Sequence, residues 1–153
     1  MKKIRDNDLR LVSIVIGIIA SLMIIFPALI VKDTNTTYTG LQVVFGYRVI
    51  DLGIIGSGEI KFSFLNLLAY SLPLIAAIVL LVSKNDKKIA TIIFAVAVIM
   101  LILVPVSTIV HMNVLGNVSV IDVDWGYRLG LNIAALLALI GLGLGLVRLI
   151  KKD

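Results

Sequence analysis

The residues with the richest chemistry gather in one polar segment. His111 is the only histidine, and Asp122 and Asp124 follow it closely. Imidazole and carboxylate groups together can hold a metal ion. The plainer interpretation is an interfacial histidine followed by two solubilising acids, and we favour it because the acids lie on a strand-like stretch. The chain has no cysteine, which excludes disulfides, thiolate metal sites and dithiol redox chemistry. We predict no catalytic residue, no cofactor and no metal.

Two asparagines stand out because they lie near the starts of apolar segments. Asn66 falls in Leu65–Ala69, and Asn132 falls in the similar stretch Leu131–Ala135. In lipid, such side chains either hydrogen-bond to a neighbouring helix or line a polar cavity. We predict inter-helix polar contacts for both residues. Their similar settings leave open that they face each other across a cavity.

Four long apolar runs position these residues. Hydrophobic residues make up 60% of the chain and charged ones only 15%, against about 25% charged in soluble domains. Each run is free of Asp, Glu, Lys and Arg, and about 20 residues span the roughly 30 Å hydrocarbon core of a bilayer. We therefore predict one all-α membrane domain over residues 1–153, an antiparallel bundle of four transmembrane helices. The runs cover residues 11–31, 62–82, 89–110 and 129–147.

Basic residues mark one side of these runs. The N-terminal tail, the 83–88 connection and the C-terminal tail together carry 10 of the 14 Lys and Arg residues. By the positive-inside rule, both termini are cytoplasmic, and the segments 32–61 and 111–128 lie outside the cell membrane. We assign the net charge of +5 to topology and anionic lipid, so the bilayer is a predicted partner and nucleic acid is not.

The two outer segments carry strand signals. Residues 41–50 are rich in β-branched and aromatic side chains, and residues 59–64 alternate polar and apolar types. Glycines in 53–58 supply turn chemistry between them. These patterns predict an extracellular β-hairpin, which Asn117–Asp124 would extend to a three-stranded sheet.

The apolar residues of this hairpin need a cover. Either they pack on the helix ends, or they receive another membrane or extracellular protein. The candidates for partner binding are Val43, Phe45, Tyr47 and Ile54.

Two resemblances bear on these expectations. The segment Tyr38-Thr-Gly-Leu-Gln-Val-Val-Phe-Gly46 resembles one in small uncharacterised four-helix membrane proteins of low-GC Gram-positive bacteria. This similarity covers about nine residues plus the hydropathy pattern, implies a bacterial cell-membrane protein and supplies no site residues. The layout of four crossings with a longer first outer segment also resembles the claudin-type tetraspan topology. The first-loop Trp and Cys pair of that family are missing, and the only tryptophan here is Trp125.

The absence of ionisable residues from the apolar runs limits the possible functions. An ion-coupled transporter needs a titratable group near the midplane of the membrane. We predict a non-catalytic multi-pass membrane protein, an interaction or accessory component that presents an outer β-cap. The alternative is a small channel or transporter subunit that forms a homo-oligomer through stripes of small residues on the first and fourth helices. These residues are Ser13, Gly17, Ser21, Ala134, Ala138, Gly141 and Gly145.

Overall fold

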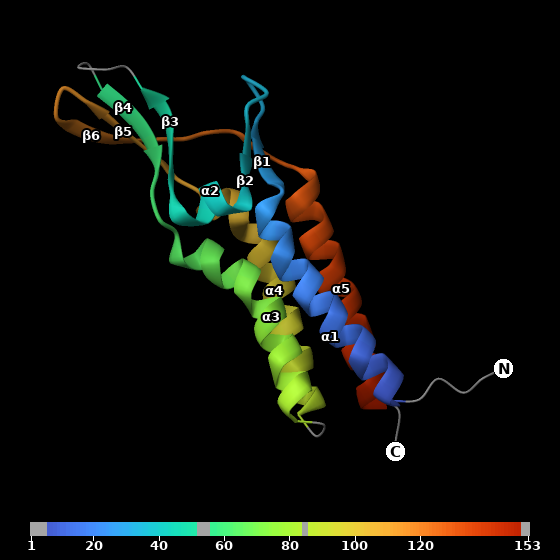
Figure 1. The fold of residues 1–153 in the computed structure, drawn as a ribbon. Coiled ribbons are helices and arrows are strands. Elements are labelled where there is room, and N and C mark those ends of the chain that lie inside the picture. The colour runs from blue at the N-terminus through green and yellow to red at the C-terminus, as the bar shows by residue number, and fades with distance from the viewer. Residues whose placement is uncertain (1–5, 52–55, 84–85, 151–153) are drawn as a thin grey trace.

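Four long helices, one short helix and two small antiparallel sheets make up the described part of the fold (Figure 1). The computed structural model describes residues 6–51, 56–83 and 86–150. The four helices are long and apolar enough to cross a membrane, as the four apolar runs predict. They are α1 (Asp6–Leu22, continued by the 3₁₀ turn η1, Met23–Ile25), α3 (Phe64–Val82), α4 (Lys87–Ser107) and α5 (Leu129–Ile150).

The four helices pack side by side through small residues. Helix α1 contacts α3 and α5, and α4 contacts the same two helices. A Cβ atom on Gly17 would lie 2.5 Å from the carbonyl oxygen of Pro73, so only glycine permits this approach of α1 to α3. In the same way, a Cβ atom on Gly141 would lie 2.6 Å from Cε1 of Phe94. Most residues of the two predicted small-residue stripes therefore lie inside the fold.

Two of the predicted helices end earlier than expected. The first helix was expected to run to residue 31, but the helical chain ends at Ile25 and Pro27–Val31 forms strand β1. Proline lacks an N–H group and disfavours the helical conformation in the residue before it, and Phe26 is accordingly extended, with φ −88° and ψ 163°. The third helix ends at Ser107 rather than at 110, two residues after Pro105.

One sheet brings together strands from the segment that follows α1 and the segment that precedes α5. Strand β1 lies between β2 (Thr37–Thr39) and β7 (Trp125–Tyr127), antiparallel to both. Leu29 pairs with Tyr38 on one side and with Tyr127 on the other, and its side chain is fully buried. The pairing of β1 with β7 therefore holds the end of α1 next to the start of α5.

The second sheet has four strands in the order β3-β4-β5-β6. A hairpin forms as predicted, since β3 (Tyr47–Asp51) pairs antiparallel with β4 (Gly56–Ile60), but its strands are shifted. Residues 56–58, expected in the turn, belong to β4, and residues 61–64, expected in the second strand, do not. The strand predicted in 117–124 also exists, as β6 (Asn117–Ile121), but it does not pair with the hairpin directly. Strand β5 (Val110–Val114) lies between them, and part of it was expected to be helical.

Residues 41–45 form a short helix instead of the predicted strand. Helix α2 (Gly40–Phe45) begins with a capping box at Thr39. The backbone N–H of Thr39 donates to Oε1 of Gln42 at 2.9 Å, and the N–H of Gln42 donates back to the Thr39 hydroxyl at 3.3 Å. Reciprocal bonds of this kind satisfy the first donors of a helix and outweigh the β-branched character of Val43 and Val44. We call the two sheets with α2, residues 27–62 and 108–128, the cap.

A candidate binding site in the cap

Trp125 contacts both the end of α4 and the first sheet of the cap. Its indole N–H donates to the carbonyl oxygen of Thr108 at 2.9 Å, which fixes β7 to the end of α4. Its ring meets Tyr38 edge to face, with centroids 5.7 Å apart. Burial, and to a smaller degree neighbouring Tyr47, raise the pKa of the Tyr38 phenol.

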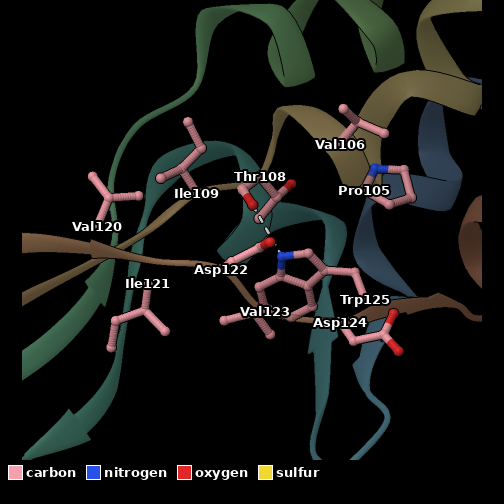
Figure 2. Close-up of a pocket in the computed structure, with 10 residues that line it drawn as sticks. All are labelled: Pro105, Val106, Thr108, Ile109, Val120, Ile121, Asp122, Val123, Asp124 and Trp125. Atoms are coloured by element: carbon pink, nitrogen blue, oxygen red, sulfur yellow. Dashed lines mark hydrogen bonds between the residues drawn. The ribbon is translucent and has the colours of Figure 1, made fainter.

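A groove of about 460 Å³ opens on one side of Trp125 (Figure 2). The end of α4 forms one wall, and the segment leading from β6 to β7 forms the other. Its volume lies within the roughly 300–1,000 Å³ range of small-molecule sites. The groove is lined by Pro105, Val106, Thr108, Ile109, Val120, Ile121, Asp122, Val123, Asp124 and Trp125.

The two carboxylates of the groove differ in their partners. Asp124 accepts from the Lys32 ammonium at 2.7 Å, so its charge is balanced. Asp122 is exposed and makes no hydrogen bond or ion pair within the described ranges 6–51, 56–83 and 86–150. The groove therefore combines apolar walls, an indole and one unbalanced negative charge.

A smaller hollow of about 220 Å³ lies between the two sheets, and Trp125 also lines it. Its volume is below the usual range for a small-molecule site. It has the size to take one apolar side chain. Its lining is largely apolar, and comprises Val31, Thr34, Thr36, Tyr38, Val49, Val110, Ile121, Val123 and Trp125.

The β5–β6 hairpin exposes apolar side chains. Its turn consists of Leu115 and Gly116, both with positive φ, at 51° and 86°. A left-handed conformation suits glycine or asparagine, but this turn has a leucine in it. The Leu115 side chain is 78% exposed. Val118 and Val120, on the same face of β6, are 62% and 63% exposed. Strand β6 is also an edge of its sheet, so its backbone has a free side among the strands described.

The predicted partner-binding residues are split between two environments. Phe45 and Tyr47 are exposed around a shallow hollow, where the ring of Phe45 lies 6.3 Å from that of Phe62. Val43 is fully buried, because it lies on the face of α2 that packs on the helices. It therefore offers no surface to a partner. Ile54 lies outside the described residues.

Asn66 joins three elements at the base of the cap. Its side chain is fully buried, and its amide donates to the Thr108 hydroxyl at 3.0 Å and to the carbonyl oxygen of Val43 at 3.4 Å. Its Oδ1 accepts from the Ser107 hydroxyl at 2.5 Å. Helices α2 and α3 are thus tied to the end of α4.

Asn132 lies in a different setting. Its side chain is exposed on α5, and it makes no side-chain hydrogen bond to the residues described. The structure does not bring it together with Asn66. His111 lies on β5 opposite Val120, and the described part of the chain contains no group of three His, Asp or Glu side chains arranged to hold a metal.

The groove and the exposed turn of the β5–β6 hairpin were not predicted from the sequence. The groove forms because residues 105–109 lie next to residues 120–125, and no local sequence pattern predicts this contact. The sequence does contain a weak indication of the turn. Leu115-Gly116 lies between two short stretches in which valines alternate with polar residues.

The fold defines a class of chain with four candidate membrane spans and a two-sheet cap at one end. Comparisons with protein-family models, curated proteins and solved structures find no match for this chain. Its function is therefore inferred from its own geometry.

Proposed function

We propose that the chain is a non-catalytic, multi-pass cell-membrane protein whose cap binds a partner protein on the outer side. In this proposal the four helices form a transmembrane bundle, and the β5–β6 hairpin is the recognition surface. The observation that carries it is the exposed apolar surface of that hairpin, Leu115 with Val118 and Val120.

The exposed surface of the helices supports the membrane placement. Apolar side chains project outward along all four helices, for example Ile18 on α1, Ile78 on α3, Ile99 on α4 and Leu136 on α5. In water, apolar surface costs about 25 cal/mol for each Å² exposed. Lipid removes that cost, and all backbone hydrogen bonds of a helix are satisfied internally there.

The charge distribution supports an outer cap. Arg10, Lys87, Lys88 and Arg148 lie at the ends of the helices that are opposite the cap. Basic residues are retained on the cytoplasmic side, so the cap faces outward in this proposal.

The position of the hairpin supports a protein partner rather than lipid. Figure 1 shows the β5–β6 turn projecting away from the four helices. Natural edge strands are usually protected by a lysine, a proline or a bulge, and β6 (Asn-Val-Ser-Val-Ile) has no such residue. A partner segment could add a strand to this edge and cover the valines with its own alternate side chains.

The small-residue stripes do not support the alternative of a channel or transporter subunit that oligomerises through them. Gly17, Gly141 and Gly145 all face side chains or backbone of neighbouring helices in the same chain. The same residues are therefore not available to join copies of the chain, and we do not propose it.

Cysteine labelling tests the proposal, because the natural chain has no cysteine. Val118→Cys would be labelled in intact cells by a membrane-impermeant thiol reagent, and a bifunctional thiol-directed reagent would link it to a second protein. Asp33→Cys, exposed in the turn after β1, is the matched control and should be labelled without forming that adduct. Labelling of Val118→Cys only after lysis would overturn the outer orientation. The same adduct from both positions, or from neither, would overturn the hairpin as the surface.

A further inference from the structure

An apolar track on α4 leads directly into the groove beside Trp125. Ile99, Leu103 and Val106 are exposed at spacings of four and three residues, which places them on one face of the helix. Val106 is 79% exposed and lines the groove, and Ile109 continues the track beyond the helix end. The groove and this face of α4 therefore form one continuous surface.

The depth of the groove corresponds to lipid headgroups, and this step rests on the proposed membrane placement. Helix α4 has 21 residues, which at about 1.5 Å per residue matches the roughly 30 Å hydrocarbon core. Val106 then lies at the outer boundary of the core. A lipid whose acyl chain follows Ile99 and Leu103 would place its headgroup between the α4 end and Asp122 (Figure 2).

The charge of the groove selects the headgroup. The carboxylate of Asp122 is unpaired in the described part of the chain, whereas that of Asp124 is balanced by Lys32. The indole N–H of Trp125 is already used on Thr108, so the small part of its ring that is exposed, 9% of the residue, is what remains for a ligand. A carboxylate and an aromatic ring both attract an ammonium group, and the carboxylate repels an anionic headgroup.

We propose that this groove binds the ammonium headgroup of a phosphatidylethanolamine lipid from the outer leaflet. The lipid amine lies against Asp122 and the ring of Trp125, and one acyl chain lies along Ile99, Leu103 and Val106. The bound lipid would fill the space between the helices and the cap beside the β6–β7 segment.

The test measures lipid retained by the full chain. The protein is reconstituted in nanodiscs of equal phosphatidylethanolamine and phosphatidylglycerol content, extracted in mild detergent, and its retained lipid is quantified by native mass spectrometry. The natural chain should retain the amine lipid preferentially. Asp122→Asn should reduce this preference about twofold to fivefold, in line with one exposed charge pair. Asp122→Lys should reverse it in favour of phosphatidylglycerol, and Asp33→Asn should leave it unchanged.

Several results would overturn this site. Equal retention of both lipids by the natural chain would do so, as would an equal effect of Asp33→Asn and Asp122→Asn. If Asp122→Asn abolishes the Val118→Cys adduct but leaves lipid retention unchanged, the groove receives a basic side chain of a partner and not a lipid. Because nanodiscs expose both leaflets, the lipid measurement remains readable even if the cap faces the cytoplasm or binds no protein.

Discussion

The two ends of the helices differ in how their charged groups are satisfied. At the end away from the cap, Arg148 is 1% exposed and donates to both carboxylate oxygens of Asp6, at 3.0 and 3.2 Å. Arg10 donates to two carbonyl oxygens in the last turn of α3, those of Leu80 and Leu81, at 2.6 and 3.0 Å. Exposed apolar side chains occur at both ends, for example Val82 and Ile150 at the end away from the cap and Leu115 on the hairpin. At the cap end, however, the exposed Asp122 carboxylate has no hydrogen-bond or ion-pair partner among the described residues.

This difference separates stability from recognition. Bidentate and charge-assisted hydrogen bonds close the end away from the cap and hold α1 to α5 and α3. Exposed apolar residues at the cap end contribute nothing to the isolated chain and gain free energy only when something covers them. Substitutions at the closed end should therefore lower stability, and those on the cap surface should change binding instead.

The largest effect is expected from Asp6→Ala. It leaves the buried guanidinium of Arg148 without this partner, and removing one member of a buried ion pair costs about 3–5 kcal/mol. Asp6 is 38% exposed, so water can partly replace it and we expect about 2–4 kcal/mol. Reversible unfolding in mixed micelles would measure the change.

A double substitution is the control for this pair. Asp6→Leu with Arg148→Met replaces both charges by apolar groups and should cost much less than Asp6→Ala. An equal loss in both variants would show that the ion pair is not what holds this end together.

Asn66→Ala should have the second largest effect, because it removes the polar connection at the base of the cap. The hydroxyls of Ser107 and Thr108 lose a buried partner, which costs about 1–3 kcal/mol. Asn132→Ala, at an exposed position, should change stability by less than about 0.5 kcal/mol. Equal effects of the two substitutions would contradict the difference in their surroundings.

The sequence predicted the helices better than the cap, for a physical reason. Length and hydropathy define a membrane span locally, so α3 and α5 begin within two residues of the predicted starts. The apolar pattern continues through Pro27–Val31 and as far as Val110, however, and the strands that form there need partners from distant segments. The Thr39 and Gln42 capping signal was present in the sequence, but the β-branched residues after it favoured a strand.

Of the candidate site, the sequence predicted the inter-helix polar contacts of Asn66 correctly, but it predicted the same for Asn132, which is exposed. It also did not show which side chains of the cap face outward. Val43 and Phe45 are only two residues apart, and the helical turn of α2 places one inside and the other outside. The pair Asp6 and Arg148 is separated by 142 residues, so only the packing of α1 against α5 reveals it.

A moderate effect is expected from Gly145→Ala at the closed end. Its new Cβ would collide with the side chain of Thr91 on α4, and overpacking of this kind costs about 1–3 kcal/mol. Gly143→Ala on the same helix meets nothing within 4 Å and should be neutral or stabilising by up to about 1 kcal/mol. Melting temperatures in detergent would compare the two, and a loss in Gly143→Ala alone would contradict the packing of α5 against α4.

The smallest effect on stability, and the sharpest on recognition, is expected from Leu115→Asn. Asparagine tolerates the positive φ of this turn better than leucine, so the variant should be stabilised by about 0.5–1 kcal/mol. It also removes the most exposed apolar side chain of the hairpin, so the adduct formed through Val118→Cys should weaken. A gain in melting temperature together with a loss of the adduct is expected only if Leu115 is retained for binding. An unchanged adduct would place recognition elsewhere on the cap, with the exposed rings of Phe45 and Tyr47 as the next surface to test.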